Sequence, residues 1–149
     1  MPAMNVLRRT ILGTLLAVLA KPLSALAAGW NIAAFGAKSA ADALKGINAA
    51  GAAPSGDVTF EAPQIAENGA VVPIEISSNV PGTTSIAVLI EKNPFPLAAV
   101  FDFKEGALPF VRLNVKMGET SEVRVIAQAA GRRYAAAREI KVTIGGCGG

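Results

Sequence analysis

Cys147 is the residue of this chain with the most distinctive chemistry. It is the only cysteine among 149 residues, and glycines flank it on both sides: Gly145, Gly146, Gly148 and Gly149. A thiolate can bond covalently to other sulfur atoms, and glycine gives a backbone wide conformational freedom. The pattern predicts a thin, flexible arm. Three extended residues beyond Ile144 would carry its sulfur about 10 Å from the preceding fold.

The sequence around Cys147 offers nothing that would activate its thiol, because the motif holds neither a base nor a cation. The whole chain lacks histidine, which excludes a Ser-His or Cys-His nucleophile pair and a His-ligated metal. A single cysteine excludes an intramolecular disulfide, a Cys-based zinc site and an iron–sulfur cluster held by this chain alone. We therefore expect no catalytic residue, no metal and no cofactor, and a cysteine on which other proteins act.

Residues 1–27 have the features of an export signal. Arg8 and Arg9 precede an apolar run over residues 11–20, and residues 25–27 (Ala-Leu-Ala) form a typical cleavage site. The arginine pair resembles a twin-arginine signal, and an ordinary secretory signal with a basic start is the alternative. The sequence predicts a protein of the periplasm that is free of the membrane once the signal is removed.

The positive net charge belongs to this signal. The chain carries 14 basic and 11 acidic residues, and Arg8, Arg9 and Lys21 lie within the signal. The remaining 11 basic residues balance the acidic ones, so the mature protein is formally neutral. A neutral chain has no general electrostatic attraction for nucleic acid or for an anionic membrane, and neither is an expected partner.

Residues 28–57 are predicted to form an N-terminal helical segment and a linker. Ser39 and Asp42 have the spacing of a capping box, which predicts a helix over residues 39–49 that stops at Gly51. Over residues 58–144 the apolar period changes to two, as in strands. Seven strands are predicted, at residues 58–62, 72–77, 86–90, 99–103, 111–115, 123–127 and 140–144.

Turn signals such as Asn68-Gly69 separate these short strands. The pattern predicts an all-β, immunoglobulin-like β-sandwich, with a small barrel as the alternative. Residues 86–90 are apolar on both faces, which indicates either a buried central strand or a strand that faces a second subunit. Arg132, Arg133 and Arg138 are expected as a small basic cluster in a solvated turn near the last strand, where they could steer an anionic partner.

The terminal motif resembles that of the SoxY family, the sulfur-carrier subunits of the bacterial thiosulfate-oxidising (Sox) system. The family's hallmark is this Gly-Gly-Cys-Gly-Gly end, here residues 145–149. The likeness extends to the twin-arginine-type signal, to Asp42-Ala43-Leu44 in the predicted helix, and to residues 93–101 (Asn-Pro-Phe-Pro-Leu-Ala-Ala-Val-Phe).

The resemblance implies a carrier rather than an enzyme, with thiosulfate-derived intermediates held covalently on Cys147. It implies pairing with a second sandwich protein, SoxZ. It also implies a SoxAX-type haem enzyme that joins thiosulfate to the thiol and a SoxB-type hydrolase that releases sulfate and leaves a persulfide. A molybdenum-containing SoxCD-type dehydrogenase would oxidise the remaining sulfur.

Two other functions remain open from the residues. One is an exported structural sandwich that is cross-linked to a partner through an intermolecular disulfide at Cys147. The other is a thiol-dependent enzyme or metallochaperone, which the absent histidine and the lone cysteine make the weaker alternative.

Overall fold

The computed structural model describes residues 29–143. The elements below belong to the unit that begins at Asn31. Two short helices, α2 (Ile32–Phe35) and α3 (Ala40–Gly46), precede the strands. The strands of the described residues are β1 (Ala53–Pro54), β2 (Val58–Glu61), β3 (Ile65–Ala66), β4 (Val72–Ser78), β5 (Thr83–Ile90), β6 (Leu97–Asp102), β7 (Phe110–Val115), β8 (Ser121–Ala129) and β9 (Arg132–Val142).

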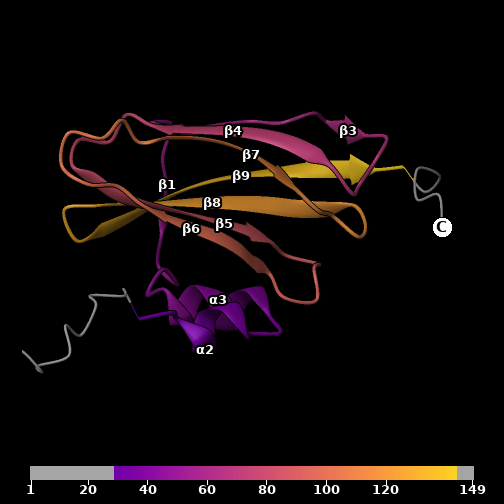
Figure 1. Ribbon diagram of the computed structural model, residues 1–149, viewed down its shortest axis with the longest axis horizontal. Coiled ribbons are helices and arrows are strands. Elements are labelled where there is room, and N and C mark those ends of the chain that lie inside the picture. The colour runs from indigo at the N-terminus through magenta and orange to yellow at the C-terminus, as the bar shows by residue number, and fades with distance from the viewer. Residues whose placement is uncertain (1–28, 144–149) are drawn as a thin grey trace, which may run out of the picture. The chain divides into compact units, whose positions relative to one another are not determined.

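The strands form two sheets that pack face to face (Figure 1). The larger sheet has the order β1-β9-β8-β5-β6, with β3 also paired to β9, and the smaller one has the order β2-β4-β7. The all-β sandwich predicted from the sequence is confirmed, and two separate sheets exclude the closed barrel. The seven predicted strands correspond to β2 and to β4 through β9.

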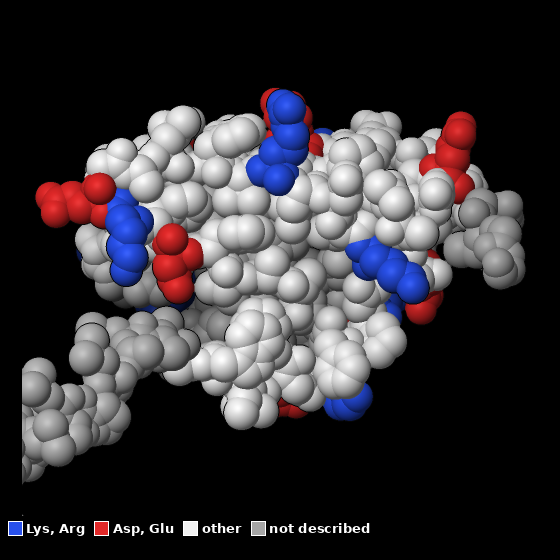
Figure 2. Space-filling view, in the orientation of Figure 1, with Lys and Arg blue, Asp and Glu red and all other residues white. Residues whose placement is uncertain are grey.

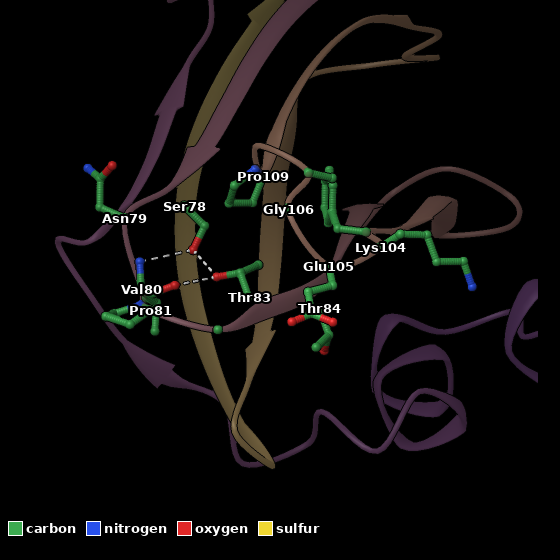
Figure 3. A pocket seen from close by; sticks show the side chains of 13 residues that line it. Ser78, Asn79, Val80, Pro81, Thr83, Thr84, Lys104, Glu105, Gly106 and Pro109 are labelled. Atoms are coloured by element: carbon green, nitrogen blue, oxygen red, sulfur yellow. Dashed lines mark hydrogen bonds between the residues drawn. The ribbon is translucent and has the colours of Figure 1, made fainter.

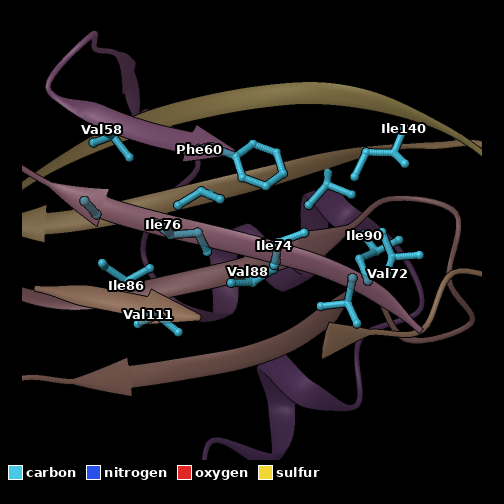
Figure 4. Packing of buried hydrophobic residues seen from close by; sticks show 14 of the residues in the cluster. Val58, Phe60, Val72, Ile74, Ile76, Ile86, Val88, Ile90, Val111 and Ile140 are labelled. Carbon is cyan, nitrogen blue, oxygen red and sulfur yellow. The ribbon is translucent and has the colours of Figure 1, made fainter. Parts of the chain in front are cut away.

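The core lies between the two sheets and follows the alternation of side chains along the strands. Ile74 of β4 and Ile86 and Val88 of β5 are among its buried members (Figure 4). On the other face of β5, Ala87 and Leu89 are buried against a second cluster that includes Leu44 of α3. Strand β5 is therefore covered on both faces by its own chain. Of the two interpretations of residues 86–90, the buried central strand is correct.

Helix α3 begins where the capping box predicted. The Ser39 hydroxyl accepts a hydrogen bond from the Asp42 N–H (3.1 Å) and donates one to the Asp42 carboxylate (2.8 Å). That bond, followed by the charge of Lys45, lowers the pKa of Asp42. The helix stops at Gly46, earlier than predicted, and Asn48 soon after it adopts a left-handed conformation (φ 55°) that a continuing helix cannot contain.

The expected turn at Arg132 and Arg133 is wrong, because both residues are paired in β9. The turn lies just before them at Ala130 and Gly131, whose φ values of 47° and 76° suit a two-residue hairpin loop. Arg138 lies six residues farther along the same strand, so the three arginines do not share one turn. Pairing with β8 extends β9 through residues 134–137, which lack the apolar alternation on which the sequence prediction relied.

Candidate functional site

The predicted site residues, Gly145, Gly146, Cys147, Gly148 and Gly149, lie outside the described residues. Thr143 is the last residue that the structure describes, and it immediately follows β9. We use the name arm for residues 144–149 and the name root for residues 141–143, from which the arm continues. The structure shows how this root is held.

Backbone hydrogen bonds hold the root against β3. The Lys141 N–H donates to the carbonyl of Gln64 (3.0 Å), and the Thr143 N–H donates to the carbonyl of Ala66 (3.1 Å). The Thr143 hydroxyl is also within hydrogen-bond reach of the Ala66 and Glu67 carbonyls (3.5 and 3.4 Å). These bonds fix the backbone on one side as far as the last described residue.

A side-chain hydrogen bond holds the root from the opposite side. The Val142 N–H donates to the hydroxyl of Thr120 (3.0 Å), just ahead of β8. The Val142 side chain packs against the core between the sheets. The root is therefore held between β3 and the start of β8, and the arm continues from a defined position.

Gly69 brings a third segment against the root. Its carbonyl accepts a hydrogen bond from the N–H of the buried Met117 (2.7 Å). A Cβ at position 69 would lie 2.4 Å from the Met117 carbonyl oxygen and 2.8 Å from Cγ1 of Val142. Only glycine fits this approach without a shift of the backbone. The sequence predicted only a turn at Asn68-Gly69, and no local signal indicated the contact of Gly69 with β9.

Asn93 joins two further loops at this end of the sandwich. Its side-chain amide donates to the carbonyl of Lys116 (2.8 Å) and accepts from the N–H of Gly118 (3.4 Å). Lys92 and Glu119 form an exposed ion pair across the same loops (3.6 Å). Asn93 thus supports the end of the sandwich from which the arm continues, and it begins the segment that carried the mid-chain resemblance.

A cavity of about 510 Å³ lies at the other end of β9, where the β4–β5 turn meets the loop before β7 (Figure 3). The hydroxyls of Ser78 and Thr83 bond to each other (2.7 Å), and they also bond to the N–H and the carbonyl of Val80 (3.3 and 2.7 Å). These hydroxyls already have protein partners. Their position, far from the root, places them outside the candidate site.

The described residues contain no group of three or more His, Cys, Asp or Glu side chains that could hold a metal ion. No helix within residues 29–143 has the length and hydropathy needed to cross a membrane. On the face seen in Figure 2, basic and acidic side chains are scattered and the middle is uncharged, so this face presents no basic patch of the kind that binds nucleic acid.

A family model described as "Sulfur oxidation protein SoxY" matches residues 45–147, a range that contains the sandwich, the root and Cys147. The chain belongs to the SoxY family. The resemblance carried by the terminal motif is thereby confirmed.

Among solved structures, the sulfur carrier protein SoxY from Chlorobium limicola f thiosulfatophilum is similar to this SoxY-family chain. The two are 36% identical, the match covers 69% of this chain and 96% of that one, and the TM-score is 0.61. A superoxide reductase (neelaredoxin) from Ignicoccus hospitalis is 19% identical over 66% of this chain and 87% of its own, with a TM-score of 0.52. That second likeness concerns the fold alone. A search of curated proteins found no match.

Membership of the SoxY family, together with the description of the Chlorobium protein as a sulfur carrier, confirms the prediction of a carrier in place of an enzyme. The root is the part of the candidate site that the structure describes.

Proposed function

We propose that this SoxY-family protein is a periplasmic carrier that holds thiosulfate-derived intermediates covalently on Cys147 and presents them to partner enzymes. Two facts about the residue support this role. Cys147 is the only thiol of the chain, and the family match extends to that residue. Export to the periplasm is supported by the signal-like residues 1–27, with their arginine pair, apolar run and small-residue cleavage site.

The observation that carries the proposal is the held root. Hydrogen bonds fix the backbone at Lys141, Val142 and Thr143. Cys147 follows Thr143 by four residues, which span at most about 13 Å when extended. A sulfur at this distance from a rigid sandwich can enter the active site of another protein while the sandwich stays outside. The four glycines keep the arm thin, so a narrow channel can accept it.

The chemistry is divided between the thiol and its partners. In loading, the Cys147 thiol and thiosulfate form a sulfur–sulfur bond, and one proton and two electrons leave. A SoxAX-type haem enzyme accepts the electrons. In release, a SoxB-type hydrolase adds water across the bond to the sulfonate, giving sulfate, two protons and a cysteine persulfide anion. A SoxCD-type dehydrogenase then oxidises the persulfide sulfur before a further hydrolysis.

A SoxZ-like sandwich is the proposed stable partner of this chain. Both faces of β5 are already covered, so pairing requires another surface. Strand β6 ends the larger sheet and has only β5 as a strand neighbour among the described residues. Its Ala98, Ala99 and Val100 are uncharged and at least partly accessible. An apolar strand edge with unpaired backbone groups suits the addition of a strand from a second sandwich.

Intact mass spectrometry without reductant tests the proposed function. We expect the protein incubated with thiosulfate and the partner enzymes to gain mass on Cys147 in steps of a thiosulfonate or a sulfur atom. Added reductant should remove these groups. A bare thiol under all conditions would contradict the proposal, as would a constant disulfide to one protein. The constant disulfide would indicate the cross-linked structural sandwich instead.

A bulky side chain beside Cys147 should slow processing without affecting the fold. We expect Gly148→Trp to lower turnover by the partner enzymes roughly tenfold or more, because the arm would no longer seat the sulfur correctly in a narrow channel. The matched control is Gly56→Trp, since Gly56 is exposed and has no atom close to the position of a Cβ. Equal turnover by the two variants would show that the arm does not need to be thin.

A further inference from the structure

The outer edge of β9 is open close to the root. Strand β8 pairs with one side of β9 from Arg132 to Ile140. On the other side, β1 pairs with β9 at Tyr134 and Ala135, and β3 pairs with it at Lys141 and Val142. No strand of the described residues pairs with this side of β9 between those positions. A pocket of about 420 Å³ lies at this gap, lined by Gln64, Ile65, Arg138, Glu139 and Lys141. We call it the notch.

Arg138 and Lys141 give the notch two positive charges against the single negative charge of Glu139. Arg138 has no carboxylate partner among the described residues. Its guanidinium lies over the ring of Phe60 (5.8 Å to the centroid) and donates to the carbonyl of Ala62 (3.4 Å). Lys141 likewise forms no ion pair with any residue that the structure describes. Its side chain shares a strand face with that of Glu139, whereas Arg138 points to the opposite face.

Two other arginines of the sandwich are neutralised by carboxylates. Arg124 contacts the carboxylates of Glu91 (2.7 Å) and Glu122 (2.6 Å), and the hydrogen bond that it donates to Glu122 is the main cause of a raised Arg124 pKa. Arg112 pairs with Glu75 at 2.8 Å. Because a guanidinium in an ion pair has its donors engaged, Arg124 and Arg112 are poor sites for a further anion. The planar donor set of Arg138 contacts no carboxylate within residues 29–143, so it suits an oxyanion.

The arm is long enough to reach the notch. Lys141 precedes Thr143 by two residues, which is about 7 Å along a strand. Cys147 follows Thr143 by four residues and can lie up to about 13 Å from it. A group bonded to the Cys147 sulfur can therefore reach Lys141. The side chain of Arg138 lines the same notch.

We propose that the notch binds the sulfonate end of a thiosulfonate adduct on Cys147 and so docks the loaded arm on the sandwich. This inference rests on the proposed function, which supplies the adduct. The bare thiol has no oxyanion, so the docking distinguishes a loaded arm from an empty one. Because the short arm tethers the sulfonate to the sandwich, the effective concentration of the sulfonate at the notch is in the millimolar range. Even a weak site for sulfonate is then substantially occupied.

Synthetic adducts on Cys147 test the docking. Reaction with 2-sulfonatoethyl methanethiosulfonate leaves a disulfide that ends in a sulfonate, and methyl methanethiosulfonate leaves a neutral one. We expect the sulfonate adduct to shift the backbone amide resonances of Gln64, Ile65 and Lys141 in ¹⁵N NMR spectra, and the neutral adduct to leave them in place. Added salt should reduce the shifts. Equal shifts from the two adducts would overturn the proposal.

Charge-removing variants show whether the notch is responsible. The sulfonate-dependent shifts at Gln64 and Ile65 should be lost in Arg138→Gln/Lys141→Gln and reduced in Lys141→Gln alone. Because Lys141 is exposed, the single variant keeps the test valid if loss of the Arg138–Phe60 contact perturbs folding. The control Arg132→Gln/Lys104→Gln also removes one arginine and one lysine charge, but at the other end of the sandwich. This variant should retain the shifts. If the shifts persisted in Arg138→Gln/Lys141→Gln, the inference would be refuted.

Free ethanesulfonate added to the Cys147→Ser variant tests whether the notch binds a sulfonate carried by the arm or a free oxyanion from solution. We expect the same amides to move only at millimolar concentration. Saturation at micromolar concentration would assign the notch to a free oxyanion and overturn docking of the arm. The docking measurements use synthetic adducts or free ethanesulfonate, so they are independent of natural loading. If mass spectrometry found no sulfur on Cys147, the proposed function would fail while the affinity of the notch was still measured.

Discussion

Cys147→Ser is expected to abolish sulfur loading and leave the sandwich intact. A serine hydroxyl forms no bond to sulfane sulfur, and the chain has no second thiol to replace the one removed. The core and the hydrogen bonds that hold the root form among residues 29–143, the part of the chain that the structure describes. Intact mass spectrometry should detect no adduct. Urea unfolding should give a free energy within about 0.5 kcal/mol of that of the unchanged protein.

The unchanged protein, treated in parallel with thiosulfate and the partner enzymes, is the control for loading. Unfolding of the serine variant would contradict a role for Cys147 limited to carrying sulfur. Sulfur retained by that variant would show that the attachment site is elsewhere in the chain.

Gly69→Ala is expected to lower the free energy of unfolding by about 1–3 kcal/mol, the range for overpacking of a close contact. The added Cβ would meet the Met117 carbonyl at 2.4 Å and the Val142 side chain at 2.8 Å. Relief requires the loop at Gly69 to move away from β9, which weakens the Met117–Gly69 hydrogen bond. Urea unfolding measures the loss. Loading of Cys147 should also slow, because the root would no longer be held in one position.

Gly118→Ala is the matched control for this prediction. Gly118 lies at the same end of the sandwich, and a Cβ at its position would meet no atom within 4 Å. The alanine variant should therefore keep its stability. If Gly69→Ala unfolded at the same urea concentration as Gly118→Ala, the close approach of Gly69 to β9 would not constrain the fold.

The alternation of apolar residues predicted the longer strands well, because burial of one face of a sheet requires an apolar residue at every second position of the strand. An apolar run without alternation indicated that residues 86–90 are covered on both faces, either by their own chain or by a second subunit. The start of β9 was missed because residues 132–137 carry no such alternation and join the sheet through their pairing with β8. The two-residue strands β1 and β3 contain too few residues for any period to be visible.

The family and the proposed attachment residue, Cys147, follow from the sequence alone. A single thiol among glycines is a local covalent feature, and its identity does not depend on the residues packed around it. Only the tertiary structure brings Gly69, Thr120 and Ala66 around the end of β9. Contacts between residues far apart in sequence depend on which strand edges pair, and no local pattern specifies that choice. The sequence thus determined the family and the proposed attachment residue, and the pairing of β3 and β8 with β9 decided where the arm begins.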